Sequence, residues 1–289
     1  MDLGSRRPLP LLPGDPEHRR HRAGEGDAVV ATTNLSTTGS TGLFFAESGE
    51  AVLLDTEALS KGEIVERFRR ELDPQAGVLA PIGSHAVLAA DGLARVLDED
   101  GEPSGAEAAC IDPEGTIATR VGVVIGCADG ALLATADGDD VTLEAIAYPD
   151  GAERATSFAN REGRPTAAAL AGDRGIWLLD TRERSWTLLP APAPLVQVTA
   201  VDDDAEHVLA LAADGRVLVL DGSGAQLAAT EPLVDASQPG VALIADQQRA
   251  YLAAPAEQRL VEIDFADGAR IARTFETPTE PAFTALTGR

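Results

Sequence analysis

The chain has 289 residues, of which 44% are hydrophobic, with 28 glycines and 18 prolines. This composition is typical of a folded chain that is rich in turns and long enough to bury a core. The formal net charge of −24 argues against nucleic acid and anionic lipid surfaces as partners, because both repel a surface of the same sign.

Residues 1–26 form an N-terminal segment without strand periodicity, crowded with Arg, Pro and His. We expect this segment to be disordered and to lie outside the folded domain. Its apolar stretch, residues 9–12, is interrupted by Pro10 and falls short of the ~7–15 residues of a signal-peptide core. No apolar run elsewhere reaches the ~20 residues of a membrane-spanning helix. Taken by themselves, these features place the chain in the cytoplasm.

Residues 27–289 read as one all-β domain. Short runs rich in Val, Leu and Ile alternate with Gly, Asp and Pro, and this pattern predicts strands joined by turns. In chain order, the predicted strands are residues 27–35, 41–48, 50–55, 63–72, 76–81, 84–90, 93–99, 121–127, 131–137, 165–172, 174–180, 185–190, 196–202, 207–213, 216–221, 225–232, 240–246, 249–255, 259–265, 269–277 and 281–288.

An apolar run that ends in aspartate recurs six times. The aspartates are Asp55, Asp98, Asp137, Asp180, Asp221 and Asp264, separated by 39 to 43 residues. A repeat of about 40–45 residues with four short strands is typical of a β-propeller blade. We therefore predict a β-propeller of about six to seven four-stranded blades, with the final run closing the ring. The aspartates are assigned to turns, where a carboxylate accepts a backbone hydrogen bond.

Cys110 and Cys127 are the two cysteines, and they enclose 16 residues. A disulfide between them would close a modest loop and contribute about 3 kcal/mol on the chain-entropy model. Two buried thiols in a reducing compartment explain the same residues equally well. The residues alone leave both interpretations open.

The segment CIDPEGTIATRVGVVIGCADGALLA, which begins at Cys110, resembles the cysteine-pair segment of bacterial zinc-chaperone β-propellers that accompany zinc ABC importers. Later segments are similar too, among them IWLLDTRERSWTLLP and AADGRVLVLDGSG. The resemblance covers about residues 40 to 288. It implies a periplasmic or cell-surface protein with a Cys110–Cys127 disulfide, and a partner in the substrate-binding protein of a metal importer.

The chain departs from this family at the zinc-binding histidines. The family's His-Gly motif corresponds here to Glu114 and Gly115, and a His-His-Gly segment corresponds to Gln75, Ala76 and Gly77. A tight zinc site needs about four ligands. The resemblance therefore implies a degenerate zinc site in this chain.

Two histidines, His85 and His207, remain within the domain, and each begins an apolar strand. We take Glu114 and His85 as the candidate metal ligands, in a partial site on one face. Two ligands hold zinc only weakly. The acidic clusters at residues 137–140 and 202–204 lack the alternating oxygen spacing of a calcium loop, and we assign them to solvated turns.

The function expected from these features is that of an extracytoplasmic, monomeric binding protein that assists a zinc importer, and not that of an enzyme. One alternative is a protein-interaction scaffold that needs no metal. Another is a propeller enzyme of lactonase type, whose site would be assembled from distant residues. The sequence has no phosphate-binding Gly-rich loop, no G-x-S-x-G elbow and no H-E-x-x-H pair.

Overall fold

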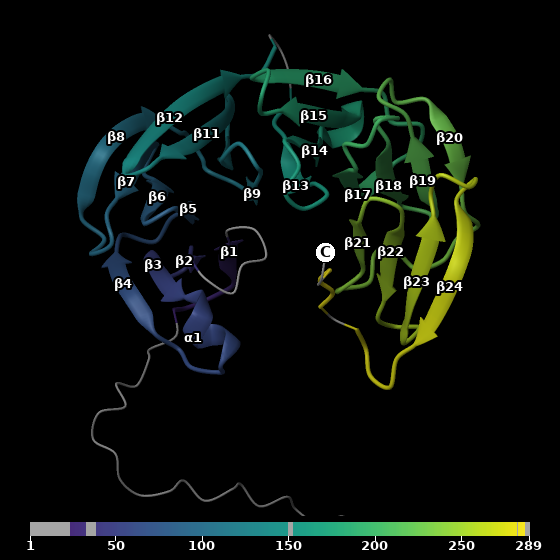
Figure 1. Ribbon diagram of the computed structural model, residues 1–289, viewed down its shortest axis with the longest axis horizontal. Coiled ribbons are helices and arrows are strands. Elements are labelled where there is room, and N and C mark those ends of the chain that lie inside the picture. Colours follow the sequence, from purple (N-terminus) through teal and green to yellow (C-terminus); the bar gives the residue numbers. More distant parts are fainter. Residues whose placement is uncertain (1–23, 33–38, 150–152, 282, 287–289) are drawn as a thin grey trace, which may run out of the picture.

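The computed structural model describes residues 24–32, 39–149, 153–281 and 283–286. Residues 1–23 of the N-terminal segment that was predicted to be disordered lie outside the described residues. The described chain forms six four-stranded antiparallel sheets, arranged around a central axis as the blades of a β-propeller (Figure 1). The predicted all-β propeller is thus confirmed, and the number of blades is six.

In each blade the first strand is innermost and the fourth is outermost (Figure 1). Blade 1 contains β1 (Ala28–Thr32), β2 (Ser40–Phe45), β3 (Glu50–Asp55) and β4 (Glu66–Glu71), with the helix α1 (Thr56–Ser60) between its last two strands. Blade 2 contains β5 (Gly77–Ile82), β6 (His85–Ala90), β7 (Leu93–Leu97) and β8 (Pro103–Ala109). Blade 3 contains β9 (Thr116–Ala118), β10 (Val123–Cys127), β11 (Gly130–Asp137) and β12 (Asp140–Ala147).

The second half of the ring repeats this plan. Blade 4 contains β13 (Thr156–Ala159), β14 (Thr166–Leu170), β15 (Ile176–Asp180) and β16 (Ser185–Leu189), with a 3-10 turn at Gly172–Arg174. Blade 5 contains β17 (Leu195–Ala200), β18 (Val208–Ala212), β19 (Val217–Leu220) and β20 (Gln226–Ala229). Blade 6 contains β21 (Ala242–Ala245), β22 (Ala250–Ala254), β23 (Arg259–Asp264) and β24 (Arg270–Glu276). No helix in the described ranges is long and apolar enough to cross a membrane.

The hydrophobic core lies in the seams between neighbouring blades. Successive side chains of a strand point to opposite faces of its sheet. In β18, Val208 and Ala210 therefore pack toward blade 4, whereas Leu209 and Leu211 pack toward blade 6. A strand that is buried on both faces reads as a continuous apolar run, which is why the middle strands were predicted from the sequence.

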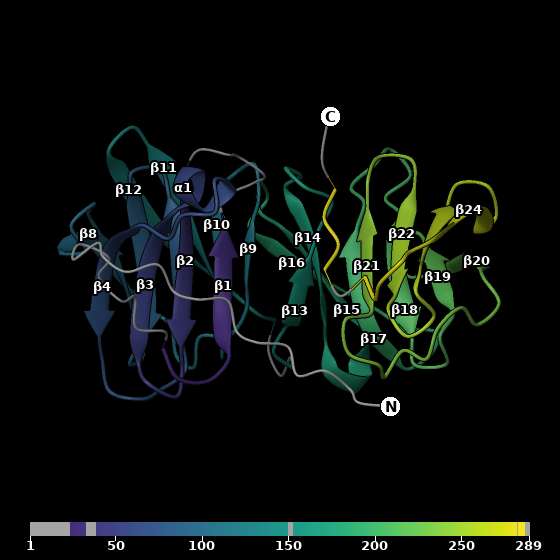
Figure 2. The same ribbon diagram turned by 90° about the horizontal axis from the view of Figure 1, so that it is seen from below.

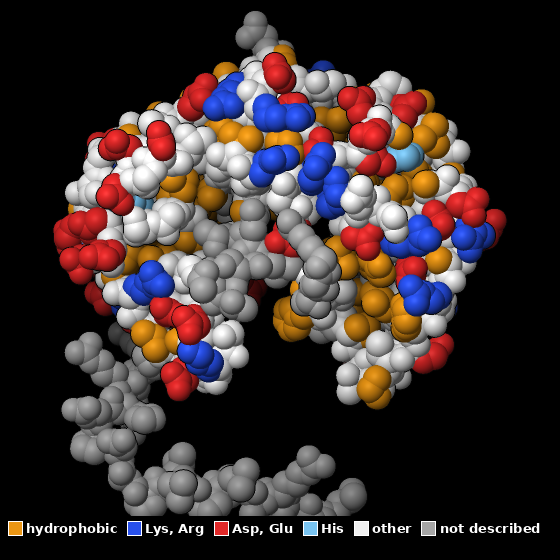
Figure 3. All heavy atoms as spheres, viewed as in Figure 1, with side chains coloured by type: hydrophobic (Ala, Val, Ile, Leu, Met, Phe, Trp, Pro, Cys, Tyr) orange, Lys and Arg blue, Asp and Glu red, His pale blue; other side chains and the backbone are white. Residues whose placement is uncertain are grey.

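The ring is open between blade 6 and blade 1, as Figures 1 and 3 show. Each of these blades shares a hydrophobic cluster with its other neighbour, but within the described ranges they share none with each other. The prediction that the run at residues 281–288 closes the ring as a strand is wrong, because residues 281 and 283–286 belong to no strand. Every blade instead takes its four strands from one continuous segment.

The six repeated aspartates end or directly follow the third strand of their blades. In four of them the carboxylate accepts a backbone N–H from the residues that follow, which form a turn after Asp98, Asp180 and Asp221 and the helix α1 after Asp55. These contacts are Ala58 N to Asp55 at 2.9 Å, Asp100 N to Asp98 at 3.0 Å, Arg182 N to Asp180 at 2.8 Å and Ser223 N to Asp221 at 2.8 Å. The assignment to turns is therefore confirmed for Asp98, Asp180 and Asp221, whereas Asp55 caps α1. Asp137 flanks the hairpin turn between β11 and β12, and Asp264 forms ion pairs with Arg249 and Arg270.

Candidate functional site

The strands alternate in direction, so their connections lie on two faces of the ring. One face carries the turns that follow the first and third strands, including the repeated aspartates, and it points toward the viewer in Figures 1 and 3. We call it the aspartate face. The other carries the loops that lead from one blade to the next, and we call it the disulfide face because both cysteines lie there.

The Cys110–Cys127 disulfide is formed, with the two Cα atoms 5.1 Å apart. Cys110 directly follows the outermost strand of blade 2, and Cys127 ends the second strand of blade 3. The bond therefore joins neighbouring blades, and both cysteines are buried. This observation decides between the disulfide and the pair of buried thiols that the residues alone left open.

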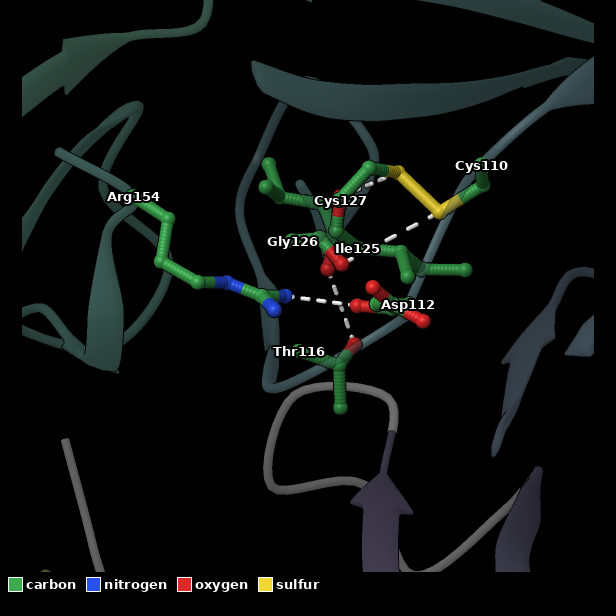
Figure 4. The surroundings of a disulfide bond; sticks show 8 residues. Cys110, Asp112, Thr116, Ile125, Gly126, Cys127 and Arg154 are labelled. Atoms are coloured by element: carbon green, nitrogen blue, oxygen red, sulfur yellow. Dashed lines mark hydrogen bonds between the residues drawn. A yellow bond between two sulfur atoms is a disulfide. The ribbon is translucent and has the colours of Figure 1, made fainter. Parts of the chain in front are cut away.

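Glu114 lies in the loop that the disulfide closes. Its backbone N–H donates to the carbonyl of Gly126 at 2.9 Å, and its carboxylate lies 3.3 Å from Nη1 of Arg154. Arg154 also donates from Nη2 to the carbonyl of Asp112, as Figure 4 shows. The Glu114 side chain is 58% exposed, but it already has a cationic partner.

Gln75 lies on the same face, between blades 1 and 2. Its side-chain oxygen accepts the backbone N–H of Asp91 at 2.7 Å, and the backbone N–H of Gln75 donates to the carbonyl of Ala46. The backbone N–H of Cys110 donates to Gly92, which follows Asp91. Of the three positions at which the resembling family has histidines, Ala76 offers no ligand atom in its side chain, while Gln75 and Glu114 lie on one face with side chains that already have protein partners.

His85 lies on the aspartate face, at the turn between β5 and β6. The strand β11 gives a ruler between the two residues. Gly83, in the same turn as His85, lies beside Ala136 near the end of β11. Glu114 bonds to Gly126, and Gly126 pairs with Ala131 near the start of β11. Five residues of strand separate the two points, or about 17 Å at 3.3 Å per residue. The structure does not bring His85 and Glu114 together.

His207 is held by protein contacts on both sides of its ring. Its Nδ1 lies 2.6 Å from Oδ2 of Asp203, and its ring packs edge-on against Phe265. Burial raises the pKa of Asp203, but the hydrogen bonds from His207 outweigh it and hold this pKa below its ordinary value. The side chain of His207 is only 11% exposed, contacts Phe265 of blade 6 and lines the pocket between blades 4 and 5.

A pocket of about 270 Å³ with both polar and apolar walls opens on the aspartate face between blades 4 and 5. Among its walls are the carboxylates of Asp180 and Asp202. Asp202 accepts hydrogen bonds from Arg164 and Thr166, each at 2.8 Å, and Asp180 pairs with Arg182. Burial raises the pKa of Asp180, but the hydrogen bonds from Arg182 and from the backbone lower it by more. The pKa of Asp180 therefore lies below its ordinary value.

The sequence did not predict this pocket, because Asp180 was assigned to a turn and Asp202 to a solvated cluster. Strand alternation could not have revealed it, because β17 ends at Ala200 and Asp202 adopts a left-handed backbone conformation beyond the strand. The Asp202 side chain is held at the pocket by Arg164 and Thr166 of blade 4. In the part of the chain that the structure describes, no group of three or more His, Cys, Asp or Glu side chains is arranged to hold a metal ion.

No protein-family model matches the sequence, and no curated protein is significantly similar to it. The fold is that of a six-bladed β-propeller. Among solved structures, it is similar to AztD from Citrobacter koseri in its apo form, with a TM-score of 0.71 and 18% identity over 87% of this chain and 73% of AztD. BamB from Moraxella catarrhalis gives a TM-score of 0.53 with 16% identity, over 86% of this chain and 76% of BamB. Sqt1 from Chaetomium thermophilum, bound to the N-terminus of ribosomal protein L10, gives 0.56 with 14% identity, over 87% and 75%.

Proposed function

We propose that this chain is an extracytoplasmic binding protein that assists a zinc importer, and that it acts through its disulfide face. The observation that carries this proposal is the Cys110–Cys127 bond, which fixes the loop of Glu114 on the same face as Gln75. The similarity to the AztD fold supports the same role. A disulfide also favours an oxidising compartment, since thiols are kept reduced in the cytoplasm.

Zinc in this proposal is cargo, and the disulfide face holds it weakly. At the positions that correspond to the family's histidines, the donors are one carboxylate, Glu114, which is already paired with Arg154, and one amide, Gln75, which is already bonded to Asp91. A zinc site needs four well-placed nitrogen, sulfur or carboxylate ligands. The residues present do not fit such a site, so we infer that recognition of a partner protein is the larger part of the function.

A scaffold that binds a partner without metal is the second candidate. It is favoured by the pairing of Glu114 with Arg154, which removes the most exposed candidate ligand on that face from metal binding. The role in both cases is binding and not catalysis. The two candidates differ in whether the partner is the substrate-binding protein of a metal importer.

The test is direct binding between the purified chain and the zinc-binding protein of an importer encoded in the same genome, measured by biolayer interferometry. We expect a one-to-one complex that Glu114→Lys weakens by about tenfold, as for a charge reversal at an interface. The matched control is Glu183→Lys, an exposed change on the aspartate face. No binding to the importer protein, or equal losses in both variants, would contradict the proposal.

A further inference from the structure

The opening between blade 6 and blade 1 has polar outer walls. On blade 1, Glu50 of β3 pairs with Arg69 of β4 at 2.8 Å, and on blade 6, Glu262 of β23 pairs with Arg273 of β24 at 2.9 Å. Both glutamates are buried, and they alternate with residues that pack into the neighbouring seams. Terminal repeats of repeat proteins carry such polar outer faces. The outer walls of the opening therefore do not require a further blade to cover them.

The inner walls of the same opening are apolar. Val30 of β1 is 56% exposed, and it faces Ile244 and Ala245 of β21 across a cavity of about 370 Å³ at the centre of the ring. Ile117 and Ala118 of β9 complete the floor. Because β1 and β21 are end strands of their sheets, the inner edge of each has no ladder partner among the described residues.

The chain itself returns to this cavity after β24. Figure 2 shows the segment rising between β21 and the blades of the other half, and Thr284, Ala285 and Leu286 line the cavity. Exposure alternates along it, since Phe283 and Ala285 are exposed while Thr284 and Leu286 are half-buried. This two-residue period is that of an extended chain with one face against a surface.

We infer that the inner opening is a peptide-binding groove for an extended segment with small and apolar residues at alternate positions, and that its resident occupant is residues 283–286 of the same chain. The segment lines the same cavity as Val30 and Ile244, whose apolar side chains no neighbouring blade covers in the open ring. A short flexible tether gives an effective concentration on the order of millimolar. A contact that is weak between separate molecules is therefore well populated within one chain.

The first test uses two single substitutions in the full chain. Leu286→Asp places a charge on the half-buried side of the segment, and Ala285→Asp places the same charge on the exposed side. We expect Leu286→Asp to make the segment about tenfold more susceptible to limited proteolysis, because the closed state loses one apolar anchor. It should also raise the fluorescence of an apolar dye, and Ala285→Asp should change neither signal. Equal behaviour of the two variants would overturn the inference.

The second test asks whether the groove accepts the segment from solution. A synthetic peptide with the sequence of residues 281–289 should bind to the Leu286→Asp chain and reverse its dye signal, and a peptide that carries the same Asp should not. Val30→Asp in the groove should act like Leu286→Asp, and the double variant should add little to either. Wild-type dimers that Leu286→Asp converts to monomers would place a second copy's segment in the groove, which contradicts an occupant from the same chain.

Discussion

Glu262 and Arg273 form an ion pair, 2.9 Å between Oε2 and Nε, on the wall of blade 6 that faces the open side of the ring. Arg249 approaches the same carboxylate at 3.4 Å. The carboxylate is almost fully buried, whereas both arginines reach solvent. The terminal blade thus ends in a charged layer where the blades within the ring present leucine and valine.

Replacing Glu262 tests whether this layer stabilises the open ring. We expect Glu262→Ala to lower the free energy of unfolding by about 1–2 kcal/mol, less than the ~3–5 kcal/mol of a fully buried pair, because the arginines remain hydrated. Chemical denaturation measures the loss. The control is Glu257→Ala, an exposed change in the same blade, which should stay within about 0.5 kcal/mol. Similar losses in both variants would show that the pair contributes nothing.

We expect loss of the disulfide to reduce the free energy of unfolding by more than loss of the Glu262 ion pair. Changing both Cys110 and Cys127 to alanine should cost about 3 kcal/mol on the chain-entropy model, which corresponds to a fall in Tm of about 5–10 °C. Thermal denaturation with and without a reductant measures it. Reductant should lower the Tm of the wild type and leave that of the double variant unchanged. A double variant as stable as the oxidised wild type would contradict the account.

Acid should weaken the contact between Asp203 and His207. Because the pKa of Asp203 lies below its ordinary value of 3.8, the stability that its charged form contributes is complete above that pH and is lost as the pH falls through the folded-state pKa. We expect Asp203→Asn to be less stable than the wild type near about pH 5, with a difference that shrinks below the ordinary value.

Denaturation curves across this pH range measure that difference. The exposed neighbour provides the matched control, since Asp204→Asn removes the same charge without a hydrogen bond to His207. A difference between wild type and Asp203→Asn that stays constant with pH would rule out the titration of Asp203 as its cause.

The sequence predicted the two middle strands of every blade and the outermost strands of blades 1, 4, 5 and 6, and it missed β8, β9, β12 and β13. β8 and β12 are mostly exposed or only partly covered, and β8 contains no apolar side chain larger than alanine apart from Pro103, so neither stands out as an apolar run. β9 has only three residues. The fold class was still clear, since the repeated aspartates mark the third strand of every blade.

These missed strands also explain why the candidate site was placed wrongly in space. Each strand reverses the chain, so the face on which a residue lies depends on the number of strands before it. Between His85 and Glu114 the chain passes through β6, β7 and β8, an odd number that carries it to the other face. With β8 unrecognised, the sequence could not show that these two residues lie on opposite faces.

Zinc is proposed to be a weakly held cargo of this chain. Isothermal titration calorimetry of the purified chain with zinc, at physiological salt, tests this most directly. Since Glu114 is paired with Arg154 and His85 lies on the other face, we expect a dissociation constant no tighter than about micromolar. Any binding that is present should be reduced by Glu114→Ala. A one-to-one site with nanomolar affinity would contradict the account, because it would require a ligand set that these side chains do not form.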